Sequence, residues 1–193
     1  MLPRQPLPTQ RRCSARSVLP HRWLMTDQRL GARMSAIVAA MPPRSGVIVR
    51  PYAMAAEGRA ALIRSIRRTA RAKRHLLLIA DRRDAGFDGV HAGGPVRGRS
   101  GKVGSGLLSL PVHNRAEADH AKRLGADMCL ISPVGPTRSH PGAQALGARG
   151  FALLSHRLGR LSWIVALGGM TEGRFRRMRH HGAHGWAAID AWQ

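Results

Sequence analysis

The sequence is poor in acidic residues, in lysine and in aromatic side chains. Its 193 residues include 10 Asp and Glu against 32 Lys and Arg, which gives a formal net charge of +22. Of the basic residues, 29 are arginine and three are lysine. Such a surplus attracts phosphates, nucleic acid or acidic surfaces. The arginines are spread along the chain, however, so a general compositional bias towards Arg, Ala and Gly explains the charge equally well.

The low content of aromatic residues and of cysteine argues against several kinds of binding site. An aromatic content of 4% leaves few side chains on which the bases of a single-stranded nucleic acid could stack, so nucleic acid is not the expected partner. Two cysteines, Cys13 and Cys129, make neither a disulfide framework nor a zinc site. No segment approaches the roughly 18 apolar residues of a membrane span. We therefore expect a cytoplasmic protein that does not contact a membrane.

The length and the hydrophobic content of 44% predict one folded domain with a sizeable core. The amino-terminal stretch is rich in proline and arginine, has no acid, and lacks the continuous apolar segment of a secretory signal. We expect residues 1–21 to form a disordered basic tail and residues 22–193 to form the domain.

Short apolar runs alternate with segments of helical spacing along this domain. Eight strands alternating with helices, with strands apolar on both faces, predict a parallel sheet closed into a compact (β/α)₈ TIM barrel. The chain is short for that fold, so we expect abbreviated helices between the third, fourth and fifth strands. An open, doubly wound sheet is the alternative, but no G-x-G-x-x-G follows the first strand. The predicted strands are residues 23–26, 46–50, 76–81, 87–91, 107–112, 128–132, 163–167 and 186–189, and the predicted helices are residues 30–41, 55–74, 115–124, 150–158 and 171–181.

Functional residues of such barrels lie where the strands end. Each residue at these positions also has a plain interpretation, as a helix cap or as part of a turn. The strand ends carry Asp27, Arg50, Asp81, His91, His113, the loop at residues 136–140, Gly168 with Gly169, and Asp190.

Two loops in this set have the chemistry of an anion site. Residues 129–147 begin as an apolar strand and continue into a polar loop, although most such loops only connect elements. Gly168 and Gly169 let the backbone approach a ligand and offer N–H groups to a phosphate, with a plain turn as the alternative. The polar groups of the first loop are Thr137, Arg138, Ser139 and His140.

Five motifs, in order and at nearly the expected spacing, resemble thiamine phosphate synthases and their relatives, the TenI-type thiazole tautomerases. The resemblance implies a (β/α)₈ barrel that binds a thiazole carboxylate phosphate. In the synthase branch it implies coupling to hydroxymethylpyrimidine diphosphate, with Mg²⁺ and release of pyrophosphate. The motifs are residues 78–82 (LIADR) with 88–91 (DGVH), 112–118 (VHNRAEA), 125–127 (GAD), 132–137 (SPVGPT) and 166–170 (ALGGM).

The sequence departs from the synthase pattern mainly at its diphosphate and metal positions. The resemblance implies a Gln-x-Arg-x-Lys signature on the second strand that grips the diphosphate, and here at most Arg50 could take part. It also implies an Asn-Asp pair at the third strand, which appears here as Ala80-Asp81 and makes Asp81 the candidate Mg²⁺ ligand. The region of Val96 lacks the second carboxylate, so the Mg²⁺ site is incomplete. His140 stands where the family's Thr-x-Thr-Lys loop ends in lysine, and Asp190 stands where the family has a serine near the phosphate at the last strand. Unless an arginine offsets Asp190, its charge would repel a phosphate.

The resemblance leaves three functional hypotheses. A synthase would use Asp81 for Mg²⁺, Arg50 and His140 for the diphosphate, and Thr137, Ser139 and Gly169 for the thiazole phosphate. A tautomerase would use His113 as the proton carrier and would need no metal. The third is a non-catalytic barrel that binds a phosphorylated ligand or, through its basic surface, nucleic acid. The sequence leaves open which of these applies and whether the chain forms a homo-oligomer.

Overall fold

The computed structural model describes residues 19–51, 56–82, 84–93, 106–138, 142 and 144–192. Eight parallel strands close into a barrel in chain order, and β8 pairs with β1 to complete it. The predicted TIM barrel is therefore confirmed. The strands are β1 (Arg22–Met25), β2 (Gly46–Val49), β3 (Leu76–Ala80), β4 (Gly89–His91), β5 (Leu107–Val112), β6 (Met128–Ile131), β7 (Trp163–Leu167) and β8 (Gly185–Ala188).

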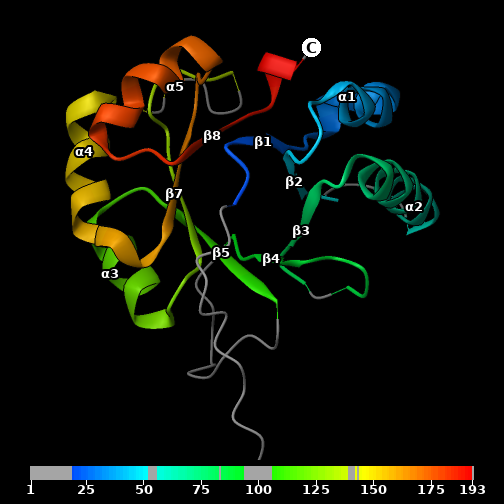
Figure 1. The fold of residues 1–193 in the computed structure, drawn as a ribbon, viewed down its shortest axis with the longest axis horizontal. Coiled ribbons are helices and arrows are strands. Elements are labelled where there is room, and N and C mark those ends of the chain that lie inside the picture. The colour runs from blue at the N-terminus through cyan, green and yellow to red at the C-terminus, as the bar shows by residue number, and fades with distance from the viewer. Residues whose placement is uncertain are drawn as a thin grey trace, which may run out of the picture.

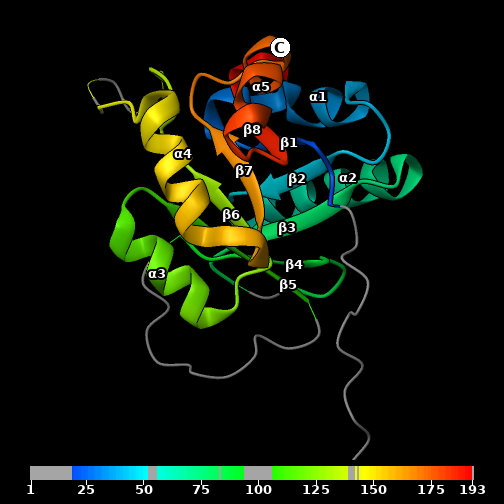
Figure 2. The ribbon, with the colours of Figure 1, turned by 60° about the vertical axis from the view of Figure 1, so that its left-hand side comes forward.

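The helices form two groups on the outside of the barrel. Figure 1 shows α1 and α2 on one side and α3, α4 and α5 on the other, and Figure 2 shows α3 and α4 lying next to each other. Abbreviated helices were expected between the third, fourth and fifth strands; in the described part of the chain β4 follows β3 with no helix between them, and residues 94–105 between β4 and β5 lie outside that part. The helices are α1 (Met34–Ala40), α2 (Ala56–Lys73), α3 (Arg115–Leu124), α4 (Gly147–Leu158) and α5 (Glu172–Met178), with the 3₁₀ segments η1 (Gln28–Arg33), η2 (Gly159–Leu161), η3 (Arg179–His181) and η4 (Asp190–Trp192).

The sequence patterns predicted α3 with its observed bounds and α2 to within one residue at each end, but the bounds of the other helices differ more. The helix expected over residues 30–41 appears as η1 and α1, and within η1 the backbone departs from helical geometry at Gly31, which has φ 49° and ψ −136°. The segment expected over residues 171–181 is likewise α5 followed by η3. No helix of the described chain is long and apolar enough to cross a membrane.

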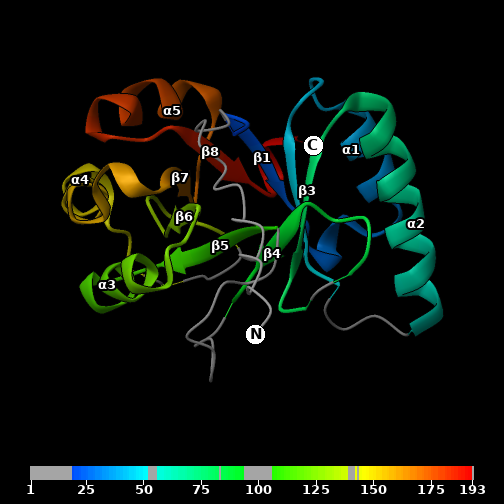
Figure 3. The same ribbon diagram turned by 60° about the horizontal axis from the view of Figure 1, so that its bottom comes forward.

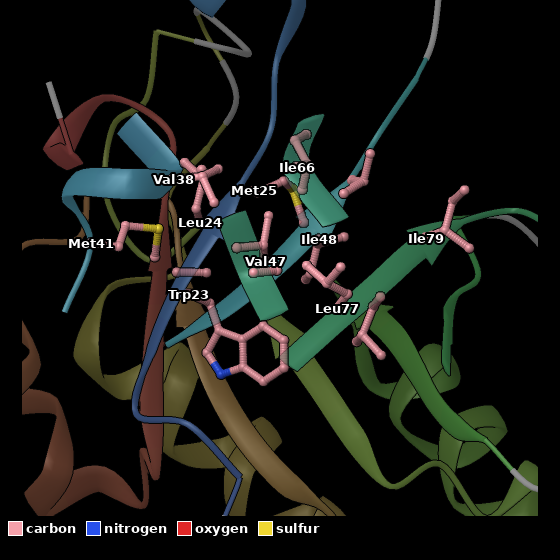
Figure 4. Packing of buried hydrophobic residues seen from close by; sticks show 14 of the residues in the cluster. Trp23, Leu24, Met25, Val38, Met41, Val47, Ile48, Ile66, Leu77 and Ile79 are labelled. Carbon is pink, nitrogen blue, oxygen red and sulfur yellow. The ribbon is translucent and has the colours of Figure 1, made fainter. Parts of the chain in front are cut away.

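Trp23 of β1 fills the barrel interior at the amino-terminal ends of the strands. Figure 4 shows the indole among the buried side chains of β1, β2 and β3. A Cβ atom at Gly46, the paired position on β2, would lie 2.1 Å from Cε3 of Trp23, so only glycine leaves room for the ring. The indole Nε1 donates to Pro20 O at 2.6 Å. This packing closes one end of the barrel and leaves the other end for a cavity.

The described chain begins slightly before the predicted domain boundary. Leu19 is buried, and His21 O accepts a hydrogen bond from Trp186 N at 2.8 Å. Residues 1–18 of the predicted tail lie outside the described residues.

Candidate functional site

A cavity of about 560 Å³ lies at the carboxyl-terminal ends of the strands, where barrel enzymes bind their ligands. Figure 3 gives a further view of the barrel, turned by 60° from Figure 1. Much of the cavity wall is apolar, with Met25, Leu130 and Leu167 pointing inward from three strands. These residues were not predicted as site residues, although the period-2 pattern of the strands places them on the inner face. An apolar wall of this kind suits a flat heteroaromatic ring.

The loops that follow β6 and β7 converge on the cavity. The ladder between the two strands continues beyond them, because Val134 N donates to Leu167 O at 2.8 Å and Gly135 N donates to Gly168 O at 3.0 Å. Thr137 and Arg138 of the first loop line the cavity, as do Gly168 and Gly169 of the second. The structure therefore brings together the two loops that the sequence suggested as an anion site.

Glycine is required at Gly168. Its φ is +99°, and a Cβ atom there would lie 2.9 Å from Cα of Pro133. Arg174 of α5 donates to the carbonyl oxygen of Gly169 and holds the second loop from outside. The close approach of the two loops thus depends on the absence of a side chain at this position.

Arg50 follows β2 and lines the cavity on the side opposite the β6 loop. Its Nε donates to Thr26 O at 2.8 Å, and its Nη2 donates to Asp27 Oδ2 at 3.1 Å. Asp27 also accepts from the backbone and side chain of Arg29. Burial alone would raise the pKa of Asp27, but these hydrogen bonds and the two arginine charges lower it. The guanidinium of Arg50 is therefore held in place by an ionised carboxylate.

Asp81, the candidate metal ligand, directly follows β3 but does not line the cavity. Its Oδ1 accepts from Gly93 N at 2.5 Å, and Gly93 does line the cavity. Among the described residues, no three His, Cys, Asp or Glu side chains gather as a metal site. One carboxylate beside the cavity fits Mg²⁺ only if phosphate oxygens and water supply the other ligands, which is a common arrangement for this ion.

His113 follows β5, lines the cavity and is about half exposed. Glu117 fixes it: one carboxylate oxygen accepts from His113 N at 2.7 Å and lies 2.8 Å from His113 Nδ1. Asn114 caps α3 by accepting from Glu117 N at 2.9 Å. This arrangement occupies Nδ1, so Nε2 is the ring nitrogen that would face a ligand.

His91 is a cavity residue that was noted at a strand end but was not selected as a site residue. It is 5% exposed, and its Nδ1 lies 3.0 Å from Ser109 Oγ. Burial lowers the pKa of His91 to about 4; the nearby Asp81 carboxylate opposes this shift, whereas Arg50 and His113 add to it. His91 therefore offers the cavity a neutral imidazole at neutral pH. Its burial results from strand pairing, which the local sequence does not reveal.

Three further positions were noted in the sequence: Ser139, His140 and Asp190. Ser139 and His140 lie outside the described residues. Asp190 follows β8 and lines the cavity, and Arg29 lies 3.7 Å from its carboxylate. The sequence left open whether an arginine offsets this aspartate, and the structure supplies one.

Solved structures of similar fold were found for this barrel. Thiamine phosphate pyrophosphorylase from Pyrococcus furiosus superposes with a TM-score of 0.74 at 23% identity, covering 91% of this chain and 88% of that one. A thiamine phosphate pyrophosphorylase from Bacteroides thetaiotaomicron gives a TM-score of 0.60 at 13% identity, covering 88% and 82%. At these identities the similarity establishes the fold.

Sequence comparison identifies the family. A thiamine-phosphate synthase of Geobacillus thermodenitrificans is 37% identical over 109 residues, which are 54% of this chain and 48% of the relative. One of Chloroflexus aurantiacus is 32% identical over 123 residues, or 60% of this chain and 56% of the relative. The matched part thus spans about half the length of these curated relatives. The model of the family described as thiamine monophosphate synthase matches residues 24–192. The chain therefore belongs to the thiamine monophosphate synthase family.

Proposed function

We propose that this protein acts in thiamine biosynthesis as a thiamine phosphate synthase. It would bind a thiazole carboxylate phosphate, couple it to hydroxymethylpyrimidine diphosphate and release pyrophosphate. The observation that carries the proposal is the placement of Arg50, just after β2, and Arg138, in the loop after β6, on opposite sides of one largely apolar cavity. The names of the similar relatives support the same reaction.

In the proposed reaction, charged and polar residues would bind the phosphate groups and apolar residues would hold the rings. The departing pyrophosphate accumulates negative charge, which fixed guanidinium groups stabilise without rearranging. Arg50 is fixed by Asp27 and Thr26, so it meets this requirement. Thr137 and the backbone at Gly168 and Gly169 would hold the thiazole phosphate, while the apolar wall holds the two rings. Ser139 and His140 remain predicted phosphate ligands of the same loop.

The proposal includes a Mg²⁺ ion that Asp81 would bind. The ion would neutralise part of the diphosphate charge when bound, with Asp81 as its carboxylate ligand and the diphosphate and water as the others. The chain itself supplies the fixed position of Asp81, through its hydrogen bond from Gly93.

Tautomerisation of the thiazole carboxylate phosphate is the second candidate function. It needs a positioned proton carrier and no leaving-group stabilisation. His113 lines the cavity and is oriented by Glu117, which favours this alternative.

Replacement of Arg50 tests the proposal. Arg50→Gln removes the fixed charge, and we expect the rate of coupling to fall by about a hundredfold, in line with the loss of one transition-state donor. Arg50→Lys keeps the charge and should retain more of the rate. Arg44→Gln is the matched control, because Arg44 is exposed and precedes β2 at the opposite end of the barrel. Equal rates for Arg50→Gln and Arg44→Gln would contradict the assignment of Arg50.

A further inference from the structure

Asp190 places a negative charge in a cavity that otherwise has the features of an anion site. It lines the same cavity as Arg50, Arg138 and the glycine pair of the β7 loop. Two like unit charges 4 Å apart repel by about 1 kcal/mol in bulk water, which corresponds to about fivefold weaker binding, and the repulsion is larger at lower effective dielectric. An unbalanced Asp190 would therefore weaken the binding of any phosphate-bearing ligand at the β8 end of the cavity.

Arg29 balances this charge from outside the cavity. Its Nη1 lies 3.7 Å from Asp190 Oδ1, and its Nε donates to Asp27 Oδ1 at 2.9 Å. The other oxygen of Asp27 accepts from Arg50. The result is a row of alternating charges, Asp190, Arg29, Asp27 and Arg50, that joins the ends of β8, β1 and β2. The net charge of the row is zero.

The geometry of Arg29 is set by its local structure. Asp27 caps η1, and its side chain accepts from both the backbone N and the Nε of Arg29. The bond from Nε orients the guanidinium, whose Nη1 lies near Asp190. The side chain of Arg29 is 39% exposed, so it can be replaced without leaving a cavity in the core.

We infer that Arg29 is a specificity-determining residue: it neutralises Asp190 and thereby lets the β8 end of the cavity accept a phosphate group. The inference rests on the proposed function for the identity of the ligand. It assigns to Arg29 a role through Asp190 and not through contact with the ligand. Consequently, the effect of losing Arg29 depends on whether Asp190 is charged.

A double-mutant cycle read out by binding of inorganic phosphate tests the inference. Isothermal titration calorimetry at low ionic strength is suitable, because screening of exposed charges is then weak. We expect Arg29→Gln to weaken phosphate binding by about fivefold or more and Asp190→Asn to strengthen it. The double variant Arg29→Gln/Asp190→Asn should bind phosphate about as well as Asp190→Asn alone, because no carboxylate charge is left for Arg29 to neutralise. Arg29→Lys, which keeps the charge, should bind like the parent, and Arg160→Gln is a control at the opposite end of the barrel, in η2 before β7.

The alternatives give different results. If Arg29 contacted the phosphate directly, or only supported the fold, Arg29→Gln would weaken binding as much in the Asp190→Asn background as in the parent, and the inference would be overturned. Thermal melting of each variant separates loss of fold from loss of charge. Unchanged binding in Arg29→Gln would also overturn it while leaving the proposed function intact. A parent protein that binds no phosphate would instead remove the proposed function, and this inference with it.

Discussion

His91 Nδ1 lies 3.0 Å from Ser109 Oγ, and the two residues are direct partners across β4 and β5 inside the barrel. Because this imidazole is buried, its pKa is lowered to about 4 from an ordinary value of 6.5. Unfolding exposes the ring and restores its ordinary pKa of 6.5, so the unfolded chain takes up a proton at a higher pH than the folded protein does. The folded protein is therefore favoured by a neutral His91, and acid should oppose it.

We expect the free energy of unfolding to fall as the pH is lowered from about 6.5 to about 4, by up to about 3 kcal/mol from His91. The fall should level off below the folded-state pKa. Burial also lowers the pKa of His75, so His75 contributes in the same direction. Asp27 has a lowered pKa and loses its contribution only below about pH 4, outside this window.

Urea unfolding at several pH values measures this dependence. His91→Gln should give a flatter curve between pH 6.5 and 4 than the parent. A parent curve that is flat over this interval, or an unchanged slope in His91→Gln, would show that His91 is not buried as a neutral ring.

Gly46 gives a prediction about the core. Gly46→Ala would place a Cβ atom 2.1 Å from the Trp23 ring, so we expect a loss of about 1–3 kcal/mol of stability from overpacking. Gly46→Ala should cost less stability in a Trp23→Leu background than in the parent, because the smaller side chain leaves room for the added Cβ atom. Additive effects of the two substitutions, measured by denaturant unfolding, would argue against this contact.

His113 separates the two proposed reactions. His113→Ala should abolish exchange between thiazole tautomers, because it removes the proton carrier that lines the cavity. Asn114→Ala is a control for disturbance of α3, since it removes the helix cap and the hydrogen bond from Asn114 Nδ2 to Glu117 Oε1 but keeps the imidazole of His113. Tautomer exchange that continues unchanged in His113→Ala would exclude this histidine from the reaction.

Asp81 is tested by the dependence of coupling on Mg²⁺. Asp81→Asn keeps the size of the side chain and an oxygen for the bond from Gly93 N, but removes the negative charge. We expect Mg²⁺-dependent formation of thiamine phosphate to be lost. Asp84→Asn, which removes a neighbouring carboxylate paired with Arg82, is the control. Coupling that survives in Asp81→Asn would reject Asp81 as the metal ligand.

The sequence predicted the barrel because each strand is a short apolar run, and this pattern does not depend on distant contacts. Helix ends were predicted less well: α4 begins at Gly147, three residues before the expected start, where no side-chain cap marks the boundary. Strand ends likewise identified Arg50, His113, Thr137 and Gly168, all of which line the cavity.

The electrostatic relationships in the site could not be predicted in the same way. Arg29 and Asp190 are 161 positions apart and meet only because β8 pairs with β1. The low pKa of His91 depends on its burial in β4, beside Ser109 of β5, and residues 94–105 separate these two strands in the sequence. Both features arise from closure of the barrel, so a local sequence pattern carries no sign of them.

The most direct test of the proposed function is a coupled assay of the purified protein. Thiazole carboxylate phosphate and hydroxymethylpyrimidine diphosphate would be supplied with and without Mg²⁺, and both thiamine phosphate and the thiazole tautomers would be followed. A synthase gives thiamine phosphate only when Mg²⁺ is present. Tautomer exchange without coupling, or no reaction with either substrate, would contradict the assignment as a synthase.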